Sequence, residues 1–124
     1  MSNHCKCLRQ GEILFIPINL PKEVINSFVK SSKSLKTKVI REGEVSGHMH
    51  SVVGNGKLME YPKSRMKWIN GNNHYLPEGD MYLKADNTIE ITHPEHKSLK
   101  LDKGDYIIRI QREYNDGRNQ QVLD

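Results

Sequence analysis

Four of the six histidines in this chain fall in two closely spaced pairs. His48 and His50 are two residues apart in a segment that predicts a β-strand, so both imidazoles should lie on one face. His93 and His96 flank a Pro-Glu dipeptide, and they converge only if the chain turns there. Three or four neutral imidazoles around one point suit a divalent transition metal such as zinc, iron or nickel. The two pairs therefore predict a metal site formed by His48, His50, His93 and His96.

Further side chains are candidates for catalysis around such a site. A carboxylate is expected to complete the metal shell, orient a histidine or act as a general base. The candidate carboxylates are Glu42, Glu44, Glu60 and Glu95. Among them we single out Glu95 as catalytic, together with Gln111 or Arg112, which would bind an anionic group at the mouth of the site. The chemistry that this set predicts is hydrolysis by metal-activated water, or Lewis-acid isomerisation, of a small-molecule substrate.

Two interpretations of the histidines need no metal. The first is general acid and base catalysis on a phosphodiester, because an imidazole with a pKa near ~6.5 serves both roles near neutral pH. Arg109, Arg112 or a lysine would then stabilise the developing charge. The second is that the histidines are ordinary polar residues on a strand that faces solvent.

The charge of the chain supports a different class of function. There are 19 lysine and arginine residues against 15 aspartate and glutamate residues, which gives a formal net charge of +4. The stretch Lys63–Trp68 (KSRMKW) places three basic residues next to the single tryptophan. Such a pattern usually belongs to a solvated charged face, and weak nucleic-acid binding is its functional interpretation. A non-enzymatic module that binds nucleic acid or a protein partner is therefore the alternative function.

The length of 124 residues allows one domain. We expect a flexible N-terminal tail over residues 1–10 and a single β domain over 11–124. No run approaches the ~18 apolar residues of a membrane span, and residues 1–10 are too polar for a secretory signal. Cys5 and Cys7 are spaced too closely for an unstrained disulfide, so reduced thiols and a cytoplasmic location are expected. A homodimer joined through a sheet edge is also expected.

The elements that must position these residues are mostly strands. Short apolar or alternating runs bounded by Gly, Asn and Pro predict strands at 12–18, 37–44, 45–53, 57–61, 81–84, 88–92, 99–101 and 106–114. Asn55-Gly56 predicts a hairpin turn between two of them. Pro21 begins a short helix that should fade within Ser31–Ser34, with apolar residues at helical spacing between. This pattern predicts an all-β, mainly antiparallel barrel or sandwich with one short helix.

One segment resembles a known family. Gly43–His50 (GEVSGHMH) is similar to the first metal-binding motif of the cupin superfamily, small β-barrels with a His-X-His, a following glutamate and a later histidine. The resemblance implies a cupin-like barrel with ligands at His48 and His50, and it assigns Glu60 and His96 to the other two positions. More widely, the chain resembles a group of small bacterial and phage-type accessory proteins. The segments that carry this second resemblance are Glu42–His50, Thr92–His96, Leu101–Tyr106, Gln111–Tyr114 and Val122–Asp124.

Overall fold

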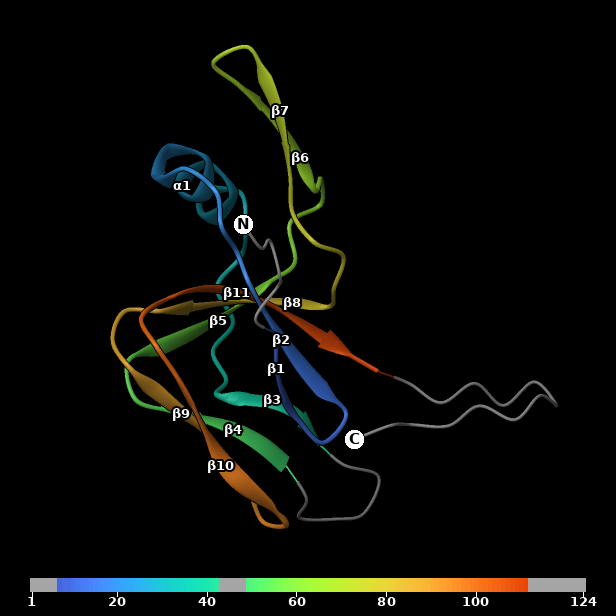
Figure 1. Ribbon diagram of the computed structural model, residues 1–124, viewed down its shortest axis with the longest axis vertical. Helices are drawn as coiled ribbons and strands as arrows, with labels where there is room; N and C mark the ends of the chain where they lie inside the picture. The colour runs from blue at the N-terminus through green and yellow to red at the C-terminus, as the bar shows by residue number, and fades with distance from the viewer. Residues whose placement is uncertain (1–6, 43–48, 112–124) are drawn as a thin grey trace, which may run out of the picture.

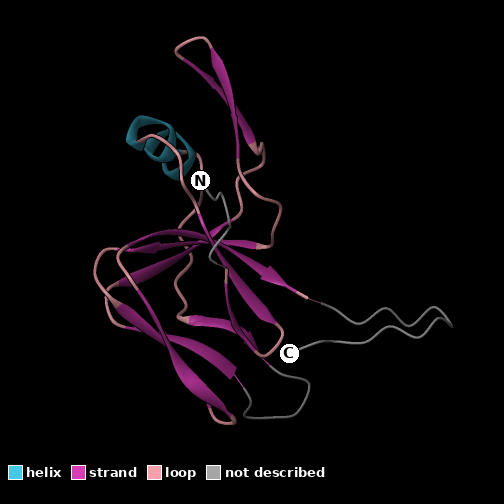
Figure 2. Ribbon diagram, in the orientation of Figure 1, coloured by secondary structure: helices cyan, strands magenta, loops and turns pink. Residues whose placement is uncertain are grey.

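Strands dominate the computed structural model, which describes residues 7–42 and 49–111. Figure 1 shows their arrangement, and Figure 2 separates strands from the single helix of the described ranges. The helix α1 covers Lys22–Lys30. The strands are β1 (Leu8–Gln10), β2 (Ile13–Pro17), β3 (Val39–Glu42), β4 (Met49–Val53), β5 (Gly56–Glu60), β6 (Met66–Ile69), β7 (Asn72–Tyr75), β8 (Met81–Ala85), β9 (Ile89–His93), β10 (His96–Leu101) and β11 (Gly104–Ile110).

These strands form three antiparallel sheets. The first has the order β1-β2-β11-β8-β5, and the second has the order β10-β9-β4-β3. The third is the isolated hairpin β6-β7. The first two sheets pack face to face through apolar side chains from both, among them Phe15 and Ile108 of the first and Val52 and Ile91 of the second. Within the described ranges they do not close into a barrel, so of the two expected architectures the chain adopts an open sandwich.

The other face of the first sheet is also covered. Val24 and Phe28 of α1 are buried against Tyr82 and Ile107 of the sheet. This explains why residues 106–108 are buried without alternation, since β11 has apolar neighbours on both faces. The all-β class with one short helix is confirmed. The helix begins just after Pro21, and it ends at Lys30 as the Ser/Lys stretch follows.

Three local expectations are wrong. Leu8–Gln10, expected within a flexible tail, form β1, which pairs with β2 across the turn at Gly11. Asn55-Gly56 does not join a hairpin, because β4 belongs to the second sheet and β5 to the first. The chain there crosses between sheets. Cys7 is disulfide-bonded, so the reduced thiols expected from the cysteine spacing are not found there, and the cytoplasmic expectation loses that support.

The hairpin β6-β7 was not expected as a pair of strands. It turns at Asn70 and Gly71, both with positive φ, and it projects away from the two sheets beside α1 (Figure 1). Among the described residues, no helix is long and apolar enough to cross a membrane.

Candidate functional site

Three histidines meet at one end of the sandwich. The alternation of β4 turns His50 and Val52 toward the space between the sheets, and His50 is only 1 % exposed. His93 ends β9 and His96 begins β10, and the two are paired in register across the tight turn between the strands. The turn expected at the Pro-Glu dipeptide therefore brings this second pair together. Ring centroids lie 4.3 Å apart for His50 and His93, 4.5 Å for His93 and His96, and 6.1 Å for His50 and His96.

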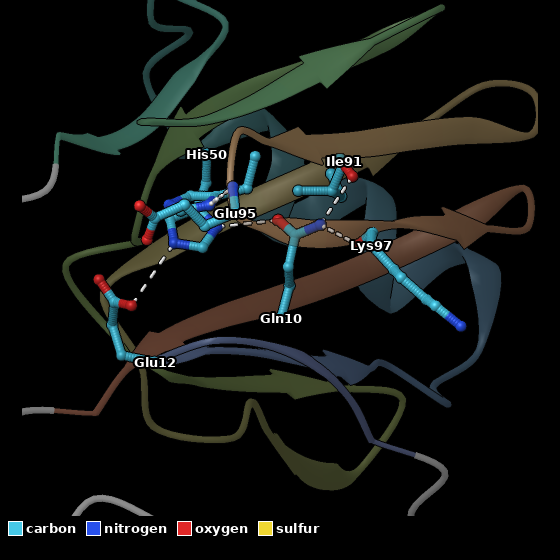
Figure 3. Close-up of polar contacts among 7 residues, drawn as sticks. Gln10, Glu12, His50, Ile91, Glu95 and Lys97 are labelled. Carbon is cyan, nitrogen blue, oxygen red and sulfur yellow. Dashed lines mark hydrogen bonds and ion pairs between the residues drawn. The ribbon is translucent and has the colours of Figure 1, made fainter. Parts of the chain in front are cut away.

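Gln10 determines how the imidazole of His50 is oriented. Its side-chain amide nitrogen donates to the carbonyl oxygens of Ile91 (2.9 Å) and Lys97 (2.8 Å), so its Oε1 is left to accept (Figure 3). That oxygen lies 2.8 Å from Nδ1 of His50. Nδ1 must therefore carry the proton and donate it to Gln10. In the neutral imidazole, the lone pair is then on Nε2.

The Nε2 atom of His50 is buried and has no hydrogen-bond partner. It faces the Glu12 carboxylate, with 3.5 Å between Nε2 and Oε1. Burial is the largest influence on His50 and lowers its pKa, with the neighbouring His93 and His96 acting in the same direction and Glu12 opposing them. A neutral His50 places a lone pair opposite a carboxylate. A cation or a proton between these two acceptors would turn their close approach into an attraction.

His93 and His96 present their nitrogens differently. Nδ1 of His93 accepts a hydrogen bond from the backbone N–H of Glu95 at 3.0 Å, so its neutral ring carries the proton on Nε2. His96 is exposed and packs over the β1–β2 turn: a Cβ added at Gly11 would lie 2.8 Å from Nε2 of His96. The same Cβ would lie 3.4 Å from Cε1 of His50. Over residues 7–42 and 49–111, no three histidine, cysteine or acidic side chains are grouped as a ready coordination shell.

The remaining predicted site residues have different outcomes. His48 and Arg112 lie outside the described residues, as does Glu44. Glu95 is exposed in the turn between the second pair of histidines (Figure 3). Gln111 follows β11, and its backbone N–H donates to the carbonyl oxygen of Glu12, which places it beside the site.

Two other residues named as candidates lie away from the site. Arg109 donates through Nε and Nη2 to the carbonyl oxygen of Glu78. Glu60 is exposed at the end of β5, the edge strand of the first sheet farthest from β1.

Two residues of the site were missed from the sequence. Gln10 was assigned to the tail, and Glu12 was regarded only as the start of a strand. The sequence signal for these two residues is weak. It consists of one polar residue on each side of Gly11, just before an apolar run. Only the pairing of β1 with β2 and the approach of β10 bring them to His50.

Comparison with known proteins adds a family but no activity. No curated protein and no solved structure matches the chain. One family model matches residues 9–111, a range that contains Gln10, Glu12 and the three clustered histidines. Because this match covers most of the 124 residues, the chain belongs to the family described as Domain of unknown function (DUF8820).

Proposed function

We propose that this protein binds a divalent transition metal ion at the end of the sandwich where His50, His93, His96 and Glu12 meet. The observation that carries the proposal is the buried Nε2 of His50, which has no hydrogen-bond partner and faces the Glu12 carboxylate. A metal ion would accept the lone pair of Nε2, and the Glu12 carboxylate is close enough to serve as a second ligand.

The hydrogen bond from His50 to Gln10 supports the same proposal. Metal-ligating histidines almost always donate their other ring N–H to an oxygen, which fixes the tautomer and the ring orientation. The amide of Gln10 is itself held by two backbone carbonyls, so its oxygen is a rigid acceptor. The side chain of His50 therefore has the orientation of a metal ligand before any ion binds.

The proposed ligand set requires only local adjustment. His50 and Glu12 provide the first two ligands, and His96 provides the third from the exposed side of the turn. His93 would join as a fourth ligand once its Nδ1 leaves the backbone N–H of Glu95. Nitrogen and carboxylate donors of this kind suit zinc, iron or nickel.

An enzymatic role would use the open side of this site. A cavity of about 340 Å³ borders His93, but its lining of Met49, Ser51, Thr92 and Pro94 places it on the outer face of the second sheet, away from the face of β4 that carries His50. That volume falls at the small end of ligand pockets. A metal ion held by the histidines would activate water for hydrolysis or polarise a carbonyl of a small substrate for isomerisation. Metal binding is the part of the proposal that the next experiment tests.

The test is zinc and nickel binding by calorimetry, together with elemental analysis of protein purified without chelator. The variants are His50→Gln and His96→Gln, and the matched control is His74→Gln, a half-buried histidine on β7 away from the cluster. We expect about one ion per chain. Both cluster variants should lose it, whereas the control should retain it.

Two outcomes would contradict the proposal. One is a folded wild-type protein that binds neither ion, which would favour the interpretations of the histidines that need no metal. The other is metal retained by both cluster variants. Because His96 is exposed, His96→Gln is expected to fold even if His50→Gln does not.

A further inference from the structure

The β6-β7 hairpin has one face packed against the helix. Lys67 extends over the ring of Phe28, with Nζ 5.8 Å from the ring centroid, and Ile69 packs against the same apolar cluster. At the tip, the side-chain amide of Asn70 donates to the Glu23 carboxylate of α1. At the base, Nε of Arg65 donates to the carbonyl oxygen of Leu76. The tip of the hairpin is therefore attached to α1, and its base is closed by Arg65.

The opposite face of the hairpin is apolar and exposed. In the β6-β7 register, Met66 pairs with Tyr75 and Trp68 pairs with Asn73, so these four residues share one face. Trp68 is 66 % exposed, Tyr75 57 % and Met66 38 %. Within the described part of the chain, Val53 is the only other exposed large apolar side chain. An exposed aromatic face on a fixed hairpin marks a surface that binds a partner.

Charge is concentrated around the same hairpin. We define the basic lobe as residues 21–34, which contain α1, and 61–77, which contain the hairpin. The lobe has one acidic residue, Glu23, and six basic residues: Lys22, Lys30, Lys33, Lys63, Arg65 and Lys67. Its net charge is +5, against +4 for the whole chain, and one of its cations, Arg65, is ion-paired with Glu78 just outside the lobe, with 3.6 Å between Nη1 and Oε2. The rest of the molecule is therefore slightly acidic, and the partner of the aromatic face is expected to be an anion.

We propose that the exposed face of the β6-β7 hairpin binds single-stranded nucleic acid. Trp68 and Tyr75 would stack on bases, because base stacking on aromatic side chains needs exposed rings on a fixed support. Lys63, which is exposed just ahead of β6, would contact phosphate, and the other lysines of the basic lobe would add a longer-range attraction. A protein partner would use the apolar face but would not require the surrounding positive charge. Binding should be tolerant of sequence and should weaken steeply with salt.

The single tryptophan makes the test direct. Titration with oligo(dT) or oligo(U) of about 16 nucleotides should quench the fluorescence of Trp68. Heparin is the comparison polyanion, since it has charge but no bases, and it should compete without the same quenching. Because Trp68→Ala removes the reporter, affinities are compared by anisotropy of a labelled oligonucleotide.

Truncation of the aromatic residues separates stacking from charge. Trp68→Ala and Tyr75→Ala should each weaken binding about 5- to 150-fold. The matched control is Val53→Ala, an equally exposed apolar residue on β4, which should leave the affinity unchanged. Lys63→Gln should lower the slope of log affinity against log salt by about one. Lys100→Gln, an exposed lysine on β10, should not change that slope.

Three results would overturn the proposal. The first is that the wild-type protein does not bind the oligonucleotide at about 50 mM salt. The second is that both aromatic variants bind it as tightly as the wild type does. The third is that the hairpin variants and their controls lose affinity to the same extent. The first result would favour a protein partner for the exposed face of the hairpin. None of these variants changes the histidine cluster, so failure here is distinguishable from failure of the metal proposal.

Discussion

At the scale of single residues, Gln10 influences the site strongly, although it is not one of the proposed metal ligands. It is buried, and its three hydrogen bonds connect β1 to the backbone of β9, the backbone of β10 and the ring of His50. Removing the side chain would leave two carbonyl oxygens without this donor and would free the His50 ring to change tautomer. Gln10 is therefore a positioning residue for the metal ligand.

We predict that Gln10→Leu weakens zinc binding about 10- to 100-fold, because the His50 ring loses the acceptor that orients it. The free energy of unfolding should fall by about 1–3 kcal/mol, because buried polar groups lose their partners. Calorimetric titration and urea denaturation measure the two effects. Gln111→Leu, a half-buried glutamine that follows β11, is the control and should bind zinc normally. Unchanged zinc affinity in Gln10→Leu would contradict the positioning role.

The sequence identifies the histidines of the site more readily than the residues that orient and contact them. The two pairs stand out because each is close in sequence, and the turn between His93 and His96 follows from the proline between them. Gln10 and Glu12 reach His50 from about forty residues away, through strand pairing that no local pattern encodes. Glu95, chosen for its place between two histidines, contributes its backbone N–H to His93, which the sequence could not reveal.

At the scale of elements, two Asn-Gly pairs show where local patterns succeed and fail. Asn70-Gly71 adopts the left-handed backbone that a two-residue hairpin turn requires, and β6-β7 forms around it. Asn55-Gly56 has the same two residue types, but no hairpin forms around it, because β5 pairs with β8 and β4 pairs with β9. Burial of both faces of the first sheet outweighs the local turn preference there. The longer apolar strands of the two packed sheets were therefore predictable, whereas β1, the β6-β7 hairpin and the assignment of strands to sheets were not.

The turn at Gly11 gives a prediction at this scale. Gly11 and Gly71 both have positive φ, so an alanine at either position is strained by roughly 1–2 kcal/mol. Only at Gly11 would the new Cβ meet a neighbour, Nε2 of His96 at 2.8 Å, whereas nothing lies within 4 Å at Gly71. Gly11→Ala should therefore displace His96 and weaken zinc binding, and Gly71→Ala should only lower stability. Parallel calorimetry and thermal melts measure both, and equal zinc affinity in the two variants would contradict the assignment of His96 as a ligand.

The helix gives a second prediction. Phe28 is fully buried beneath the hairpin and carries Lys67 on its ring. Phe28→Ala should lower the free energy of unfolding by about 3–5 kcal/mol, because a large side chain leaves a cavity between α1 and the first sheet. Asn26→Ala, exposed on the same helix, should change it by less than about 0.5 kcal/mol. Chemical denaturation followed by circular dichroism measures both, and a small effect at Phe28 would show that the helix is not anchored through this ring.

At the scale of the whole molecule, the two proposed sites lie at opposite ends. The turn between β9 and β10 and the turn between β1 and β2 are at one end in Figure 1, and the β6-β7 hairpin is at the other. The first sheet lies between them, with one apolar cluster on each face. The histidine cluster borders the space between the two sheets, whereas the hairpin rests on α1. The described contacts therefore contain no shared side chain through which one site would change the other.

This separation predicts that metal and nucleic acid bind independently. Zinc at about one hundred times its dissociation constant should raise the free energy of unfolding by about 2.7 kcal/mol, because only the folded chain presents the ligands together. The same zinc should change oligonucleotide affinity by less than about twofold, because coupling needs an element that both ligands bias. Thermal melts with and without zinc measure the first effect, and anisotropy titrations measure the second. His50→Gln, which should lose the melting shift and keep the oligonucleotide affinity, shows whether zinc acts through the cluster. A change of oligonucleotide affinity that requires an intact His50 would instead mean that the first sheet transmits a rearrangement from one apolar cluster to the other.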